Sequence, residues 1–299
     1  LDAYYKYTSD ALLFLNVPGS TGYGSTLANA GEVSNKGIEI TVSSVNIKTN
    51  DFEWSTSFNF ARNVNRAEKL VAPITFEARE YRRTQEGAPL GSYWLYKQLY
   101  VDPQTGDAVF EDVNKDNKIT QEDRLLLGNM IPDFFGGLSN SFSYKNFDLT
   151  INFTYQYGNE LYNFNRYILE GGGTRDASRS ILASQLNRWQ KPGDITNTPR
   201  LTSVGNNYNI EQNSRYLEDA SFIRLKTVTL NYNLPTSISS KAALGKVSLY
   251  VMGTNLWLAT KYTGADPESS GSAIQNLEGM DTATPPQPIG VQVGAKINF

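Results

Sequence analysis

Side-chain polarity alternates from one residue to the next along several segments of this chain. In residues 147–158 every odd position carries an aromatic or aliphatic side chain, and every even position is polar or glycine. A β-strand points successive side chains to opposite faces, so such a segment has one apolar face and one polar face. The same alternation recurs in residues 38–42, 52–60, 247–251 and 291–299. The sequence therefore predicts an all-β fold.

Strands with one apolar face occur in soluble β-sandwiches and in antiparallel transmembrane β-barrels. The alternating segments are about ten residues long or slightly longer, the length that a tilted strand needs to cross a bilayer. Their apolar faces are rich in Phe, Trp and Tyr near the segment ends, as in an interfacial girdle, and the opposite faces carry Asn, Gln, Thr, Lys and Glu. No apolar run approaches the roughly 18 residues of a membrane helix. The pattern favours the membrane barrel, with the sandwich as the soluble alternative.

The connections between the predicted strands fall into two length classes. If the last strand runs toward the periplasm, the short connections lie on the periplasmic side, at 48–51, 145–146 and 235–246. The long connections then lie outside, at about 9–32, 65–133, 159–220 and 259–288. This asymmetry is typical of outer-membrane barrels. We expect eight strands, with two more possible in residues 92–101 and 108–111, so closure of the barrel needs strands outside this chain.

The composition removes several classes of function. The 299 residues include no histidine and no cysteine, which excludes disulfide frameworks, thiol nucleophiles, His-based triads and the usual zinc sites. A net charge of −3 indicates no basic surface for nucleic acid. A surface glycosidase would need two carboxylates in a catalytic arrangement, and the sequence has no recognisable one. We therefore expect neither an enzyme nor a nucleic-acid-binding protein.

One helix is predicted in the long outer connections. Residues 177–189 place Leu182, Leu186 and Trp189 on one helical face, and Pro192-Gly193 would end the pattern. This helix is expected to pack within the loops rather than to bind a ligand.

Residues 112–123 match the spacing of a calcium-binding loop, which supplies oxygen ligands from positions 1, 3, 5, 7 and 12. The donors would be the side chains of Asp112, Asn114, Asp116 and Asp123 and the main-chain carbonyl of Lys118. An asparagine replaces the usual turn glycine, the last ligand is Asp rather than Glu, and no helices clearly flank the loop. The loop is predicted to hold a structural Ca²⁺, with a solvated acidic turn as the alternative.

A further set of segments carries a family resemblance. They are residues 29–39 (NAGEVSNKGIE), 86–92 (EGAPLGS), 112–124, 132–140 (PDFFGGLSN), 189–194 (WQKPGD), 220–226 (ASFIRLK), 255–256, 260–268 (TKYTGADPE) and the terminal Phe299. Together, in this order and over essentially the whole chain, they resemble the C-terminal half of the SusC/RagA family of TonB-dependent transporters from Bacteroidota.

The resemblance implies a barrel of about 22 strands with an N-terminal plug and long extracellular loops. Residues 1–299 would form the C-terminal part of that barrel, about eight to ten strands, as a fragment or as one subunit of a split or nicked transporter. The implied partners are the N-terminal part of the same transporter with its plug and remaining strands, a SusD-like surface lipoprotein, outer-membrane lipids, and TonB–ExbB–ExbD acting through the N-terminal part. The implied location is the outer membrane of a Gram-negative, Bacteroidota-type bacterium.

The implied function is energy-driven import of large nutrients, either oligosaccharides or oligopeptides. Two Tyr- and Asn-rich segments, 162–165 and 206–209, are candidates to meet such a ligand, although no substrate residue is assigned. A passive porin-like barrel and a soluble calcium-binding β-sandwich adhesin stay open as alternatives.

Overall fold

The chain forms one large antiparallel sheet and several small ones. The computed structural model describes residues 1–17, 19–75, 81–170, 180–201, 212–242, 244–269 and 278–298. The large sheet comprises β1 (Asp2–Asn16), β2 (Ser25–Lys48), β3 (Phe52–Leu70), β10 (Phe134–Tyr144), β11 (Phe147–Tyr157), β14 (Phe222–Asn233), β15 (Val247–Thr260) and β17 (Gly290–Ile297), in this order across the sheet. Every neighbouring pair is antiparallel, so the predicted fold class is confirmed.

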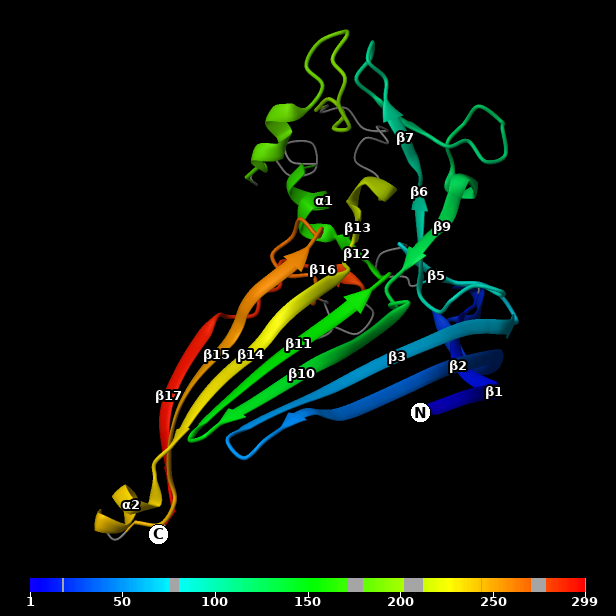
Figure 1. Cartoon of the computed structure of the whole chain (residues 1–299). Helices are drawn as coiled ribbons and strands as arrows, with labels where there is room; N and C mark the ends of the chain where they lie inside the picture. The colour runs from blue at the N-terminus through cyan, green and yellow to red at the C-terminus, as the bar shows by residue number, and fades with distance from the viewer. Residues whose placement is uncertain are drawn as a thin grey trace.

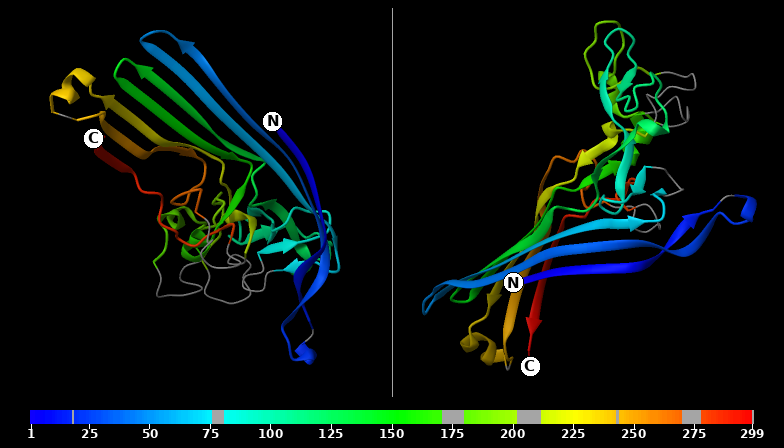
Figure 2. Two further views of the ribbon diagram at one scale, coloured as in Figure 1. Left: turned by 90° about the horizontal axis from the view of Figure 1, so that it is seen from below. Right: turned by 90° about the vertical axis from the view of Figure 1, so that its right-hand side faces the viewer.

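The large sheet is a curved wall with two open edges (Figures 1 and 2). β1 forms one edge and β17 the other, and no ladder joins them in the described part of the chain. The N-terminus lies at the β1 edge, and the C-terminus lies at the lower end of β17 (Figure 1). A bilayer cannot satisfy the N–H and C=O groups of an open edge. The eight strands therefore form an open segment of a larger barrel and not a closed barrel, as expected.

The strand register sorts the side chains onto one apolar and one polar face. Phe147 pairs with Tyr232 at a ring distance of 4.8 Å, and Trp54 stacks on Phe142 at 5.8 Å. The apolar face is open to its surroundings: Leu230, Val251 and Val293, which lie side by side on three strands, are 44%, 47% and 77% exposed. A soluble sandwich would bury this face against a second sheet. The sandwich alternative is therefore wrong.

The connections lie at the two ends of the wall as the sequence predicts. The strand ends leave short connections at 49–51 and 145–146 and a longer one at 234–246, and these lie opposite the large loop body (Figure 1). The bounds of the predicted outer connection at 9–32 are wrong, because β1 and β2 continue as a hairpin through most of it and leave only residues 17–24 between them. Main-chain pairing of Leu12 with Asn29 extends the ladder, and a register shift next to Asp10, whose φ is 53°, interrupts it.

The remaining strands form small sheets in the outer loops. They are β4 (Ile74–Thr75), β5 (Arg82–Thr84), β6 (Ser92–Tyr96) and β9 (Arg124–Asn129) in one sheet, β7 (Gln98–Val101) and β8 (Ala108–Phe110) in another, and β12 (Glu160–Asn163), β13 (Leu217–Asp219) and β16 (Met280–Asp281) in a third. The two additional strands considered at 92–101 and 108–111 thus exist, but they belong to these loop sheets and not to the wall.

Helices are short and few in the described ranges. They are α1 (Phe164–Glu170), α2 (Thr236–Ser239) and the 3-10 helices Gly19–Thr21, Gln121–Asp123, Ala183–Asn187, Ser214–Tyr216 and Ser240–Ala242. None of the helices described is long and apolar enough to cross a membrane.

The helix predicted over residues 177–189 is wrong in its described part. Residues 177–179 lie outside the described residues, and the rest contains only the 3-10 turn Ala183–Asn187. Leu186 is 73% exposed and Gln185 is 4% exposed, so the expected apolar face is not the buried one. A short isolated helix is marginal without a packed apolar stripe.

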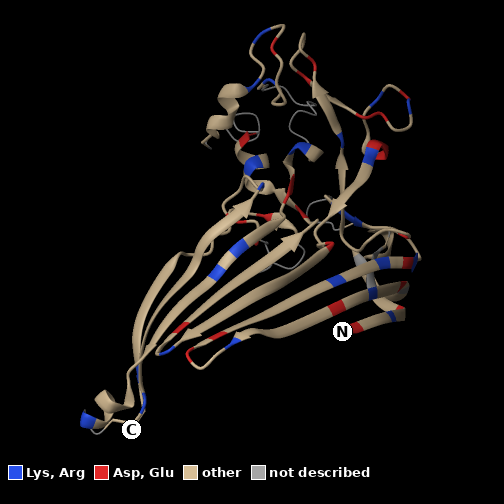
Figure 3. Cartoon of the chain, in the orientation of Figure 1, with Lys and Arg blue, Asp and Glu red and all other residues tan. Residues whose placement is uncertain are grey.

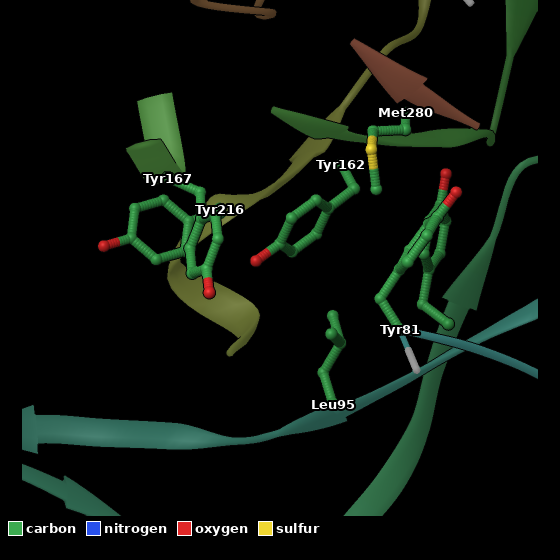
Figure 4. Close-up of a cluster of buried hydrophobic side chains, with 7 residues drawn as sticks. Tyr81, Leu95, Tyr162, Tyr167, Tyr216 and Met280 are labelled. Carbon is green, nitrogen blue, oxygen red and sulfur yellow. The ribbon is translucent and has the colours of Figure 1, made fainter. Parts of the chain in front are cut away.

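Tyrosine dominates the core of the loop body. The cluster contains Tyr81, Tyr93, Leu95, Tyr162, Tyr167, Tyr216 and Met280 (Figure 4). The rings approach at 5.6 Å between Tyr81 and Tyr162 and at 5.3 Å, edge to face, between Tyr167 and Tyr216. Such contacts stabilise beyond the area they bury. Because these residues come from three outer connections, the cluster joins those connections into one body above the wall.

Candidate functional site

The polar face of the large sheet offers neutral hydrogen-bonding groups. Across the sheet, Ser57 lies opposite Ser139, and Ser139 lies opposite Asn152, whose Nδ2 donates to Thr227 Oγ1 at 2.7 Å. Charged residues are most frequent in the loops and at the strand ends, and only scattered charged residues lie within the strands of the wall, on β2, β3 and β14 (Figure 3). A membrane barrel turns its apolar face to lipid and its polar face to the lumen. This face is therefore the lumen wall.

A shallow cavity of ≈ 300 Å³ lies on the wall where β2, β3 and β10 adjoin. It is lined by Ser43, Ser44, Val45, Ser55, Thr56, Ser57, Ser139 and Ser141. Ser43 Oγ and Ser57 Oγ are 3.1 Å apart across the β2–β3 ladder. Short side chains make the hollow, and their hydroxyls can exchange hydrogen bonds with water or with a polar ligand.

A buried ion pair holds the connection after β15 to the wall. Arg224 Nη2 donates to Asp266 Oδ1 at 2.6 Å, and Arg224 Nε lies 2.7 Å from Glu268 Oε2. The other carboxylate oxygen of Asp266 accepts the main-chain N–H of Gln287 at 3.0 Å. Both ends of that connection are thereby fixed to β14.

A second ion-pair network joins α1 to β13. Arg166 lies 2.6 Å from Glu170 and 2.9 Å from Glu218, and Thr263 Oγ1 donates to Glu218 at 2.7 Å. Burial opposes the charge of Arg166, but the hydrogen bonds with Glu170 and Glu218 outweigh it and raise the pKa of the guanidinium. The network fixes the position of α1 against the next outer connection.

Two buried phenols link distant segments. Tyr93 Oη donates to the carbonyl of Gly279 at 2.6 Å, and burial raises the pKa of Tyr93 well above its ordinary value. Tyr262 Oη donates to Asp281 at 2.7 Å, and burial followed by this hydrogen bond raises the pKa of Tyr262. Both hydroxyls therefore stay protonated and act as donors.

Glu160 lies at the junction of the wall and the loop body. Its carboxylate accepts the N–H of Asn129 at 2.9 Å and lies against Gly128, where a Cβ would approach within 2.6 Å of it. Gly128 has φ 57°, so glycine meets both the backbone and the space requirement. Burial raises the pKa of Glu160, and the nearby Asp219 adds to the effect.

The loop at 112–123 has the turns that its spacing suggests. Asp112 accepts the N–H groups of Lys115 and Asn117 at 2.7 and 2.8 Å, and both of those residues have positive φ. Asp123 is fully buried and accepts the N–H groups of Val113 and Thr120 at 2.9 and 2.7 Å. Burial would raise the pKa of Asp123, but these amide hydrogen bonds hold it below the ordinary value.

The donor set and the spacing fit calcium, but the carboxylates of the loop are turned toward its own amides. Among the described residues no group of three or more acidic side chains converges as a metal site. Asn114 Oδ1 and Asp116 Oδ1 likewise accept N–H groups within the loop. Calcium binding through Asp112, Asn114, Asp116, Asp123 and the Lys118 carbonyl stays a prediction.

The first two residues of the Tyr- and Asn-rich segment 162–165 are buried and are not presented to a ligand. Tyr162 is fully buried in the tyrosine cluster, and Asn163 is 3% exposed and donates to Glu218. The segment 206–209 and Phe299 lie outside the described residues. The anchors Arg224, Asp266 and Glu268 were not singled out as a site, although they lie inside two of the segments that carry the family resemblance.

The chain is similar over nearly its whole length to TonB-dependent receptors. It is 35% identical to TonB-dependent receptor P3 of Formosa agariphila over 99% of this chain and 32% of that protein. It is 24% identical to TonB-dependent receptor SusC of Bacteroides thetaiotaomicron over 100% of this chain and 30% of that protein. No protein-family model matches the chain.

A solved structure shares the fold. The RagAB peptide transporter superposes with a TM-score of 0.86 at 25% identity, covering 99% of this chain and 32% of that chain. Fold and lumen face define a segment of a transmembrane β-barrel with its outer loops. Over nearly its whole length the chain is similar to TonB-dependent receptors, SusC among them, and to the RagAB transporter, and it spans about a third of the length of the relatives it matches.

Proposed function

We propose that the chain forms part of the barrel wall and outer loops of a TonB-dependent importer of large nutrients, oligosaccharides or oligopeptides. The observation that carries the proposal is the wall itself, with an exposed apolar face and a polar lumen face that has a hydroxyl-rich hollow where β2, β3 and β10 adjoin. Short hydroxyl side chains on the wall can offer a passing ligand many weak hydrogen bonds without a single site of high affinity. Relatives that are receptors and a RagAB transporter favour active import over a passive porin and over an enzyme.

The proposal extends to the partners of the complete transporter. We infer an outer-membrane location in a Bacteroidota-type bacterium, with the apolar face against lipid. The two open edges of the sheet would pair with the remaining strands of the same transporter, which would also carry the plug. The outer loop body would meet a SusD-like surface lipoprotein, and TonB–ExbB–ExbD would act through the plug. These inferences rest on similarity to TonB-dependent receptors and to a RagAB transporter.

Bilayer conductance separates the importer from a porin without a known substrate. The full-length protein that contains this chain would be purified in detergent and inserted into planar bilayers. A plugged importer is expected to give no steady ion current, and the same preparation from native membranes is expected to retain a surface lipoprotein. A large, steady, ohmic conductance would overturn the importer in favour of the porin.

A further inference from the structure

Two arginines flank a tryptophan on one face of the outer sheet β4-β5-β6-β9. Arg83 Cζ lies 4.6 Å from the Trp94 ring centroid, and Arg124 Cζ lies 5.0 Å from it. Arg124 Cζ also lies 4.9 Å from the ring of Tyr96. Because β6 lies between β5 and β9, one arginine approaches Trp94 from each side. We call Arg83, Trp94, Arg124 and Tyr96 the arginine–aromatic ladder.

The ladder occupies the face that the tyrosine cluster leaves uncovered. Side chains alternate along β6, so Tyr93 and Leu95 enter the buried cluster, whereas Trp94 and Tyr96 point to the other face. Trp94, Arg83 and Arg124 are partly exposed there, while Tyr96 is buried beside Phe110 at a ring distance of 6.0 Å. The ladder is therefore fixed by packing and still open on its outer side.

In the described part of the chain the positive charge of Arg83 has no acidic partner. Within the described ranges Arg83 makes no ion pair, and its buried Nε has no hydrogen-bond acceptor. The neighbouring Arg82, on the other face, contrasts with it, since Arg82 Nη2 lies 3.3 Å from Glu278. No hydrogen bond of the Trp94 indole N–H occurs among those residues either. An unpaired guanidinium that is partly desolvated destabilises the free protein.

Stacking orients the donors of the ladder. A guanidinium that lies on an aromatic ring keeps its N–H groups at its edge, where they can bind an oxyanion in a bidentate manner. The Trp94 indole N–H adds a further donor on the same face. The group that complements such an arrangement has several acceptor oxygens and a negative charge.

We propose that the arginine–aromatic ladder is a subsite for a carboxylate or sulfate group carried by the imported ligand. The inference rests on the proposed import function and adds a substrate class to it, namely anionic oligosaccharides or acidic peptides. The group is recognised through Arg83, whose charge no acidic side chain of the described residues neutralises, and through the Trp94 N–H, while Arg124, which lies on the rings of Trp94 and Tyr96, holds the indole in place.

The test measures binding by the full-length transporter in detergent. Calorimetry would compare four probes: an oligogalacturonate, a sulfated oligosaccharide, an oligoglutamate peptide and a neutral malto-oligosaccharide. The first three distinguish carboxylate from sulfate and sugar from peptide. The wild type is expected to bind at least one anionic probe, more weakly as salt increases, and to bind the neutral probe less well. Arg83→Gln is expected to lower the affinity for the anionic probe by about tenfold, which is the effect of losing one charge-assisted contact.

Matched variants make the result specific. Arg200→Gln removes the same charge from another outer loop, where Arg200 pairs with Asp107, and is expected to leave the affinity unchanged. Arg83→Lys keeps the charge but loses the planar fork, so an intermediate affinity is expected. Thermal unfolding of each variant shows whether the fold is retained. Trp94→Phe removes the indole N–H without changing any charge, and its affinity for the anionic probes is measured in the same way.

Three outcomes would overturn the inference. These are equal affinity of wild type and Arg83→Gln for the anionic probes, failure of all anionic probes to bind, or loss of lipoprotein binding alone in Arg83→Gln. The last would assign the ladder to an acidic surface of the partner instead. In each case the proposed import function would still stand if the wild-type transporter shows no steady conductance and retains its surface lipoprotein.

Discussion

Arg224 on β14 and Asp266 in the connection after β15 form an ion pair of 2.6 Å although they are 42 residues apart, and both side chains are nearly inaccessible to solvent. Main-chain amides of Glu268 and Gln287 complete the hydrogen bonds of Asp266. The pair decides where the outer connection sits on the wall.

Removal of Arg224 is expected to destabilise the outer part of the protein. Arg224→Gln leaves Asp266 buried without its cation, which typically costs about 3–5 kcal/mol. The measurement is thermal unfolding of the full-length transporter. Lys48→Gln is the control, because Lys48 pairs with Glu53 while 70% exposed and such pairs contribute about 0–1 kcal/mol. Equal melting temperatures for the two variants would contradict the importance of the buried pair.

Glu160 is expected to make stability depend on pH. Burial raises its pKa, so the folded protein holds the proton at a pH where the unfolded chain has released it. Its contribution is therefore fully present at acidic pH and is lost as pH rises through the raised pKa. Glu160→Gln should raise the melting temperature at pH 8 and change it little at pH 4, since the amide oxygen can still accept from Asn129. Glu53→Gln, at a partly exposed position, is the control. A pH-independent effect of Glu160→Gln would count against this account.

Calcium is expected to stabilise the loop that contains Asp112 and Asp116. A ligand at about 100 times its Kd adds about 2.7 kcal/mol to the stability of the state that binds it. Terbium luminescence and the calcium-dependent rise in melting temperature should both disappear in Asp112→Asn. Asp194→Asn, which alters another turn-forming aspartate, should keep both signals. Absence of either signal in the wild type would favour the solvated acidic turn.

An arginine introduced on the apolar face of the wall is expected to impair assembly more than one introduced on the polar face. Val251 is 47% exposed on the apolar face, and Met252 follows it on the polar face beside Thr229. An arginine on the lipid face of a barrel costs about 2–4 kcal/mol at mid-membrane and less toward the interfaces. Val251→Arg should therefore reduce the fraction of heat-modifiable, assembled transporter in outer membranes. Met252→Arg should leave assembly near the wild-type level, and similar losses for both variants would argue against the assigned faces.

Much of the wall could be predicted from the sequence because period-two alternation is a local property. Phe147 and Asp148 point to opposite faces in any strand, and the short turns at 49–51 and 145–146 follow from the ends of the alternating runs. The hairpin through residues 9–32 was missed because its main-chain ladder continues where side-chain alternation fades.

The sequence alone determined the all-β pattern, the two faces and the family resemblance, since each depends on residue order over short distances or on segments read in order. How the outer connections pack into one loop body was decided by the tertiary structure alone. Tyr93 reaches the carbonyl of Gly279 across 186 residues, and Tyr162 is buried rather than presented to a ligand. Among the described residues it also left Arg83 without an ion pair beside Arg82, which pairs with Glu278. Such contacts form when distant connections pack together, and no local period encodes them.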